Sequence, residues 1–235
     1  MGKRRDEPEG CERLLAALRA FADPARAEKE KSYQKSRWEH WGVALPKMDA
    51  AIRAAVADLD SRASLALAER LWGEPVWDLK IVAGRILARP RIAPDAQVWA
   101  FVTARMGELD GWAVADNLAG VGSRCLIADP ARLDEVETWV ASPHLWTRRA
   151  ALVFTLPWAK GSRDPGRMLG WAALLTSDRE WFIQKAIGWR LRELSKREAD
   201  RVRRFLAAHG AAMKPFARRE AEKYLVAPPR RRSRL

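Results

Sequence analysis

Apolar residues recur at helical spacing along most of the chain. Strong helix-forming residues accompany this period over 48–72, 135–143 and 182–210, whereas signals for strands are nearly absent. Pro, Asp and Gly interrupt the pattern at short intervals and divide it into segments of about 9 to 16 residues. The sequence therefore predicts an all-α fold of short helices joined by short turns.

An aromatic residue also recurs at one place in successive predicted helices. The separations are 36, 35, 34, 36 and 34 residues, and the positions are Trp41, Trp77, Trp112, Trp146, Phe182 and Phe216. A fixed period of this length indicates helical hairpins stacked in an α-solenoid. The sequence patterns of tetratricopeptide and ankyrin repeats are absent, so HEAT-like hairpins in a C-shaped stack fit best.

Positive charge follows the same repeat. Four of the six positions three residues after the aromatics carry a cation, the full set being Ala44, Lys80, Ala115, Arg149, Lys185 and Arg219. In a solenoid these cations would form a column, and we expect it to give the concave side a basic groove.

Length and charge narrow the class of protein. The 235 residues are 48% hydrophobic, and the net charge of +13 at pH 7 is spread along the chain, which favours a polyanionic partner. No apolar run approaches the roughly 18 residues of a membrane span, and the basic start is not followed by the apolar stretch of a secretory signal. We expect one domain over 10–227, with disorder in 1–9 and in the basic tail 228–235. That tail is either a solvated end or an arm that contacts DNA.

Cysteine and histidine give no sign of a metal site. Cys11 and Cys125 are far apart and lack a neighbour at ligand spacing, which is typical of free thiols in a reducing cytoplasm. The three histidines, His40, His144 and His209, are scattered and fit structural or surface roles. The sequence also lacks a phosphate-binding glycine loop and the common hydrolase motifs.

Two groups of residues are candidates for chemistry. Trp112 and Asp116 are four residues apart, which places a carboxylate and an indole on one helix face. The alternative is that Asp116 caps a neighbouring helix and Trp112 is core. Further on, Trp189 lies opposite an apolar stripe together with Lys185 and Arg192, the stripe being Ile183, Ile187, Leu191 and Leu194. Such a face suits DNA, because cations neutralise phosphates while the indole packs on a sugar or base.

Arg148 and Arg149 are a further candidate pair at the start of a predicted helix. The repeat favours Arg149 as the phosphate ligand, since its guanidinium offers a planar fork to phosphate oxygens. A solvated helix start is the alternative for Arg148. The twelve tryptophans exceed what a core of this size requires, which also favours stacking on sugars and bases.

With these residues in view, the chain resembles the AlkD family of DNA alkylation repair proteins. The resemblance is carried by five segments: 35–48, 111–120, 145–153, 182–193 and 216–225. It implies a HEAT-like glycosylase that removes 3-methyladenine and 7-methylguanine, with the family's catalytic Trp and Asp at Trp112 and Asp116, its groove arginine at Arg149 and its second sugar-packing Trp at Trp189.

The resemblance also implies a mechanism and partners. A monofunctional enzyme would act on alkylated duplex DNA as a bacterial cytoplasmic monomer, without a base-flipping pocket and with no metal or organic cofactor. Asp116 would stabilise the cationic sugar that forms as the glycosidic bond breaks. Two alternatives stay open at this point: a non-catalytic HEAT-like protein that binds branched or distorted DNA, and a solenoid that binds an acidic protein.

Overall fold

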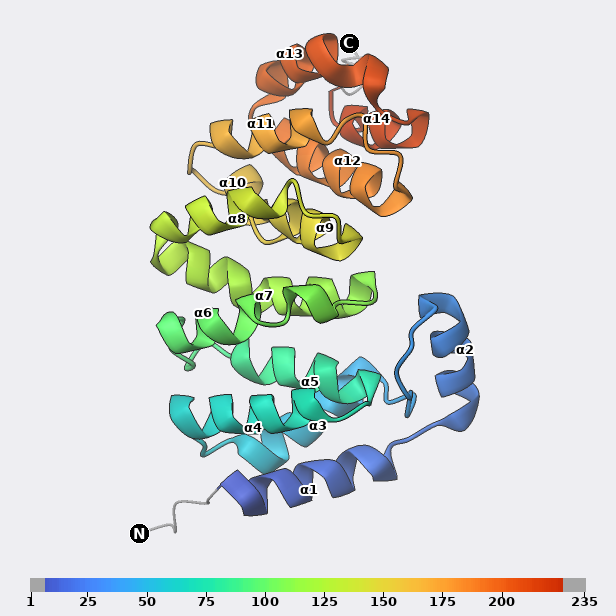
Figure 1. Cartoon of the computed structure of the whole chain (residues 1–235), viewed down its shortest axis with the longest axis vertical. Coiled ribbons are helices and arrows are strands. Elements are labelled where there is room, and N and C mark those ends of the chain that lie inside the picture. Colours follow the sequence, from blue (N-terminus) through green and yellow to red (C-terminus); the bar gives the residue numbers. More distant parts are fainter. Residues whose placement is uncertain (1–6, 226–235) are drawn as a thin grey trace, which may run out of the picture. The chain divides into compact units, whose positions relative to one another are not determined.

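The computed structural model describes residues 7–225 (Figure 1). Apart from an isolated bridge between Glu39 and Val76, all regular structure in this range is helical, so the all-α prediction is confirmed. None of the described helices is long and apolar enough to cross a bilayer. The first helix begins at Glu7, so the expectation of disorder is wrong for residues 7–9, whereas the tail 228–235 lies outside the described residues.

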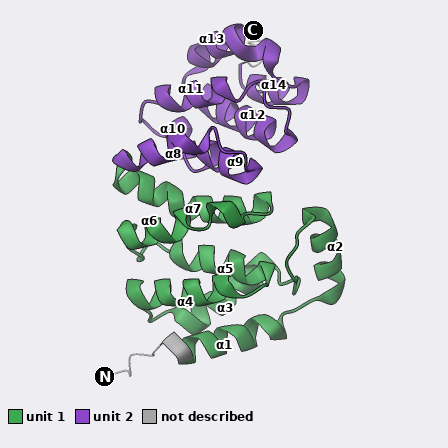
Figure 2. Cartoon of the chain, viewed as in Figure 1, with its two compact units in different colours: residues 1–130 green, residues 131–235 purple. Residues whose placement is uncertain are grey.

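The chain forms two compact units, residues 1–130 and 131–235 (Figure 2). A single domain over 10–227 stays a prediction. In unit 1, α3, α5 and α7 pack side by side as one layer, while α1, α4 and α6 pack against them as a second layer. Its helices are α1 (Glu7–Ala20), α2 (Pro24–Gln34), α3 (Leu45–Val56), α4 (Ser61–Gly73), α5 (Trp77–Leu87), α6 (Ala96–Thr103), the 3₁₀ turn η1 (Met106–Glu108) and α7 (Trp112–Ala128).

Unit 2 repeats this arrangement. One layer is formed by α9, α12 and α14, and α8, α11 and α13 lie against it. The helices after the 3₁₀ turn η2 (Pro130–Arg132) are α8 (Leu133–Trp139), α9 (Leu145–Val153), α10 (Leu156–Lys160), α11 (Gly166–Leu174), α12 (Trp181–Ser195), α13 (Ala199–His209), the turn η3 (Gly210–Ala212) and α14 (Pro215–Glu222). Each unit is therefore a stack of helical hairpins.

The aromatic repeat marks the start of one helix in each hairpin. Trp77 and Trp112 are the first residues of α5 and α7, and Trp146, Phe182 and Phe216 are the second residues of α9, α12 and α14. The remaining member, Trp41, precedes α3 by four residues. The spacing of 34 to 36 residues is therefore the length of a hairpin, as predicted.

Many of the aromatic side chains belong to the core. Six of the twelve tryptophans are buried: Trp72, Trp77, Trp99, Trp139, Trp158 and Trp171. The apolar stripe of α12, from Ile183 to Leu194, is also fully buried as predicted. The number of tryptophans is thus explained in good part by packing between the layers, because each indole fills a large volume there.

Within each unit, arginines join several hairpins to the one before. Arg89 donates to Val56 O at 2.8 Å, Arg124 to Leu87 O at 3.0 Å, and Arg190 to Leu152 O at 2.5 Å. These carbonyls lie at or just beyond helix C-termini, where the last carbonyls have no partner within the helix and a cation is favourable. Part of the positive charge therefore holds the fold together instead of facing solvent.

Candidate functional site

Lys80 is placed differently from the prediction. Its side chain is 2% exposed, and Nζ donates to Trp72 O at 2.6 Å and to Glu74 O at 3.1 Å, at the end of α4. Burial lowers its pKa from the ordinary lysine value. The reason for the error is that α5 is buried on nearly all sides, so the repeat position three residues after Trp77 lies inside unit 1. Lys80 is therefore not a surface ligand for phosphate.

Asp116 lies on α7 in a pocket of unit 1. The pocket has a volume of about 340 Å³, and the Asp116 side chain is half-buried in it. The other lining residues are Asp49, Arg85, Ala88, Arg89, Asn117 and Gly120. Arg85 is fixed there, because its Nε donates to Asp49 Oδ1 at 2.7 Å and its Nη1 to Asn117 Oδ1 at 3.4 Å. The pocket thus presents two guanidinium groups beside the Asp116 carboxylate.

Trp112 begins the same helix one turn earlier. It is half-buried and does not line the Asp116 pocket. Tyr33 of α2 approaches it edge-on, with ring centroids 6.4 Å apart and an interplanar angle of 83°, and Tyr33 itself is 73% exposed. Tyr33 was not among the predicted residues, since no local pattern shows a contact between residues so far apart in the chain.

Two buried or half-buried carboxylates hold the segment between α2 and α3, and thereby α2, in place. Asp110 accepts from Ser36 Oγ at 2.8 Å, and Asp78 accepts from the backbone N–H groups of Trp41 and Val43, each at 2.8 Å. Because Asp110 directly precedes Gly111, the N-cap of α7, its bond ties the segment after α2 to the helix that carries Trp112 and Asp116, whereas Asp78 ties this segment to α5.

Unit 2 has an aromatic pocket of about 380 Å³ between α12 and α14. It brings together the three predicted residues of α12, which are Lys185, Trp189 and Arg192, with three residues that were not predicted to lie here, which are Trp181, Phe216 and Glu220. Trp181 is 47% exposed and stacks on Phe216, with centroids 5.5 Å apart and an interplanar angle of 25°. Lys185 Nζ lies 4.7 Å from the Trp181 ring centroid. The cation and indole face expected on α12 is therefore present.

The signal for Trp181 was available in the sequence. Trp181 directly precedes the repeat residue Phe182, so a second aromatic residue next to a repeat position was visible in the sequence. Phe216 is a predicted repeat position, but its stacking partner Trp181 lies on the neighbouring hairpin, a contact that a one-dimensional pattern does not show.

These two sites can be compared with known proteins. The family model described as DNA alkylation repair enzyme matches residues 14–225. The chain belongs to the DNA alkylation repair enzyme family. Its fold is similar to that of a predicted DNA alkylation repair enzyme from Enterococcus faecalis, with 21% identity, a TM-score of 0.74, and coverage of 88% of this chain and 98% of the other. It is also similar to AlkD2 from Streptococcus mutans, with 20% identity, a TM-score of 0.60, and coverage of 86% and 97%. A comparison with curated protein sequences finds no match.

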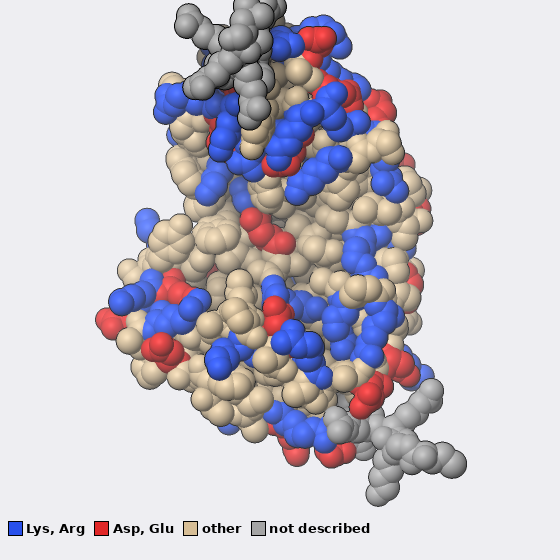
Figure 3. All heavy atoms as spheres, turned by 180° about the vertical axis from the view of Figure 1, so that it is seen from behind, with Lys and Arg blue, Asp and Glu red and all other residues tan. Residues whose placement is uncertain are grey.

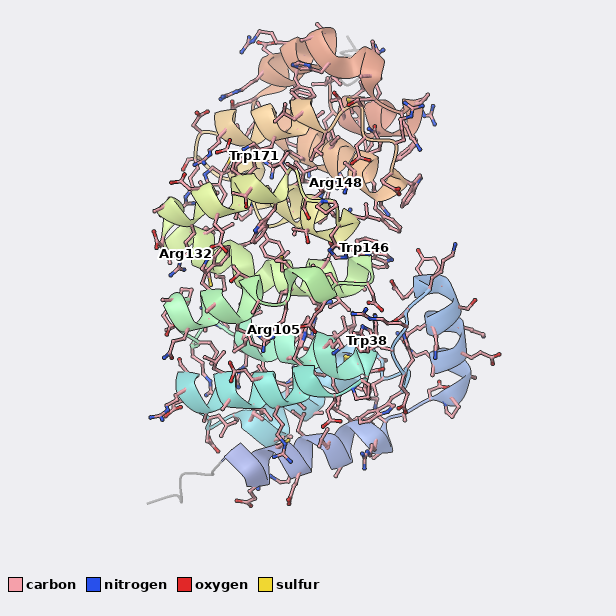
Figure 4. The ribbon with its side chains drawn as sticks, in the orientation of Figure 1. Trp38, Arg105, Arg132, Trp146, Arg148 and Trp171 are labelled. Atoms are coloured by element: carbon pink, nitrogen blue, oxygen red, sulfur yellow. The ribbon has the colours of Figure 1, made fainter. Side chains whose placement is uncertain are left out.

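Two of the remaining predicted cations, Arg148 and Arg149, have defined partners in unit 2. Arg148 Nε donates to Asp178 Oδ2 at 2.9 Å, and its Nη1 donates to the carbonyls of Ser142 and Pro143. Arg149 is 2% exposed, and its Nη1 donates to Phe182 O at 2.9 Å. Arg148 and Trp146 of α9 are labelled in Figure 4. Contact of either arginine with DNA stays a prediction, but the expected column of surface cations is interrupted at Lys80 and Arg149.

Two cations of the predicted set are accessible. Lys185 is exposed in the aromatic pocket, and Arg219 is exposed on α14. Arg192 is half-buried and forms ion pairs with Glu193 and Glu220. These carboxylates partly neutralise the positive potential that Arg192 presents to solvent. On the face opposite to that of Figure 1, Lys and Arg side chains gather in several groups (Figure 3).

No group of three or more potential metal ligands occurs within residues 7–225. Both cysteines are buried and form no disulfide. His40 is buried and stacks on Trp77, with ring centroids 4.8 Å apart.

Proposed function

We propose that the chain is a monofunctional DNA glycosylase that hydrolyses the N-glycosidic bond of cationic alkylated purines in duplex DNA. The observation that carries this proposal is Asp116, a half-buried carboxylate in a pocket lined by Arg85 and Arg89, one helical turn from Trp112 on α7. Membership of the DNA alkylation repair enzyme family supports the coarser part, repair of alkylated DNA.

The reaction needs little from the protein, because alkylation at N3 or N7 makes the purine a good leaving group. As the bond from C1′ to nitrogen breaks, its electron pair neutralises the cationic base and leaves positive charge on the deoxyribose. The Asp116 carboxylate stabilises that charge and orients a water molecule, whose oxygen forms the new bond to C1′ and whose proton passes to the carboxylate or to solvent. The indole of Trp112 offers a ring face that favours the same cation.

The lining of the Asp116 pocket supports chemistry at the sugar without a base-flipping pocket. Enzymes that take up a flipped base stack it between aromatic or apolar side chains. No aromatic side chain lines this pocket, whose walls are small or charged, with Ala88 and Gly120 beside the two arginines. Such walls fit a charged sugar-phosphate backbone, with the alkylated base left outside.

The aromatic pocket of unit 2 supports binding to the backbone of DNA. Trp189 packs on a deoxyribose, and the exposed Lys185 neutralises a phosphate. Contacts of this kind position a protein but carry no information on sequence. The proposed enzyme therefore recognises the chemical lability of the lesion more than the identity of neighbouring bases.

The test is Asp116→Asn, which retains shape and removes the charge. We expect release of 3-methyladenine and 7-methylguanine from methylated duplex, measured in single turnover, to slow by about 10²-fold or more, while affinity for that duplex is retained. Asp49→Asn is the matched control, since it removes a carboxylate from the same pocket, and we expect a much smaller effect.

Circular dichroism establishes that both variants are folded. Release by a folded Asp116→Asn at the wild-type rate would show that Asp116 is structural. If the wild-type protein binds the methylated duplex but releases no base, the chain is instead a non-catalytic DNA-binding protein, and affinity for branched or distorted duplex becomes the measurement of interest.

A further inference from the structure

A second basic pocket in unit 1 adjoins that of Asp116. It has a volume of about 540 Å³ and lies between the C-terminal end of α3 and the loop that follows α5, and its lining residues are Arg53, Ala57, Arg89, Pro90 and Arg91. None of these residues belongs to the cations that the repeat pattern singled out.

The charge of this pocket is not compensated by acidic side chains. Among the described residues, no carboxylate forms an ion pair with Arg53, Arg89 or Arg91, whereas nearby Arg85 pairs with Asp49. Burial, followed by the like charge of Arg91, lowers the pKa of Arg89 to about 10. Three cations held together without an anion favour the binding of one.

The loop that carries two of these arginines is fixed. Arg124 of α7 donates to four of its carbonyls, those of Leu87, Arg89, Pro90 and Ile92, at 2.6 to 3.0 Å. Arg89 and Arg91 in turn donate to Val56 O at 2.8 and 2.9 Å. A ligand therefore meets guanidinium groups that are already positioned.

Donors remain available for that ligand. Arg89 uses three donor interactions, to Ile86 O, Val56 O and Ser64 Oγ, and Arg91 uses its Nη2 on two carbonyls. A guanidinium has five N–H groups, so both side chains keep unused ones. Arg53, in the last turn of α3, is exposed and makes no side-chain hydrogen bond or ion pair in the described part of the chain.

The two pockets of unit 1 share a wall. Arg89 lines both the Asp116 pocket and the pocket of Arg53 and Arg91. An anion bound by Arg53 and Arg91 would therefore lie next to the proposed reaction site. In DNA, a phosphodiester lies next to each deoxyribose. The planar fork of a guanidinium group binds phosphate oxygens strongly.

We propose that Arg53, Arg89 and Arg91 form a phosphodiester-binding site for the DNA strand on which Asp116 acts. The place of this strand rests on the proposed function, whereas the anion site itself rests on the arrangement of the three arginines. The site holds the backbone on one side of the reacting sugar and is formed by unit 1 alone.

The decisive variant is Arg53→Ala, because this side chain has no structural bond to lose. Binding of unmodified duplex DNA is measured by fluorescence anisotropy over a series of salt concentrations. We expect the slope of log affinity against log salt to decrease by about one, as for the loss of one phosphate contact. The matched control is Arg62→Ala, an equally exposed arginine near the start of α4 in the other layer, which we expect to leave the slope unchanged.

Arg91→Lys provides a second measurement, since it retains the charge but loses the fork, and we expect weaker binding with an unchanged slope. Inorganic phosphate added at constant ionic strength distinguishes a duplex site from a site for the free anion. Competition between phosphate and duplex that disappears in Arg53→Ala is the expected result, because both anions use the same guanidinium groups. An unchanged slope in that variant would overturn the proposal, and phosphate binding that still depends on Arg53 would then assign the site to the free anion. Base release by the wild-type protein tests the proposed function separately, so the two can fail independently.

Discussion

Arg190 allows a quantitative test of how the hairpins are joined. It is fully buried in α12 with no acidic partner among the described residues, and burial lowers its pKa to about 9. This shift below the ordinary arginine value corresponds to roughly 5 kcal/mol for keeping the charge in that site at neutral pH. Two hydrogen bonds stabilise the folded state against this cost, because Nη2 donates to Leu152 O at 2.5 Å and to the hydroxyl of Thr155. Hydrogen bonds from a charged donor contribute roughly 1.5–3 kcal/mol each.

These two contributions nearly cancel, which determines the outcome of Arg190→Met. We expect the free energy of unfolding to change by less than about 2 kcal/mol, because the methionine retains much of the volume and removes both the desolvation and the bonds. Arg190→Ala should lose a further 2–5 kcal/mol or so, because it leaves a cavity. Urea unfolding followed by tryptophan fluorescence and circular dichroism measures both.

The pH dependence provides an independent check. Because the folded-state pKa lies below the unfolded value, the unfolded chain binds more protons above about pH 9, so the wild type gains stability relative to Arg190→Met as the pH rises from about 8 to 10. A loss of more than about 3 kcal/mol in Arg190→Met, with a difference from the wild type that does not vary with pH, would refute this reasoning. It would mean that the hydrogen bonds outweigh the burial of the charge.

Two further outcomes follow from buried positions. Burial lowers the pKa of His40, which stacks on Trp77. The free energy of unfolding should therefore fall as the pH drops through about 6.5, because the unfolded histidine then takes up a proton. His40→Phe should flatten this pH dependence in urea unfolding. Gly188→Ala should destabilise by about 1–3 kcal/mol, since its Cβ would lie 2.8 Å from Ala217 O, whereas Gly170→Ala, which meets nothing within 4 Å, should stabilise by about 0.5–1 kcal/mol. A Gly188→Ala protein that melts with the wild type would contradict the close approach of α12 and α14.

The fold was predictable from the sequence because periodicity is a local property. The spacing from Trp77 to Trp112 is the length of one hairpin, and the stripe from Ile183 to Leu194 is a buried helix face. Both follow from the geometry of the helix, in which residues three and four apart share a face. The grouping of Lys185 with Trp189 could be predicted for the same reason.

The destinations of the charged side chains could not be predicted in this way. Lys80 and Lys185 occupy the same repeat position, yet one is buried and the other exposed, because α5 is covered on nearly all sides and α12 leaves one face open. Likewise, Arg53 and Arg91 belong to different helical hairpins, and their pocket exists only after α3 and α5 pack together. Partners separated by about 35 residues are set by tertiary packing, which a pattern along the chain does not contain.

The arginine bonds between hairpins also have a direction. Arg89, Arg124, Arg190 and Arg197 each donate to carbonyls that lie 32 to 39 residues earlier in the chain. Arg149 is an exception, because it donates to Phe182 O in the following hairpin. In a hairpin that has just left the ribosome, these earlier carbonyls therefore lack their arginine partner until the next hairpin has been synthesised and folds against it. Synthesis from the N-terminus completes each hairpin in order, whereas loss of a later hairpin would expose the carbonyls of its predecessor. Within each unit, several hairpins thus depend on their successor for part of the satisfaction of their backbone carbonyls.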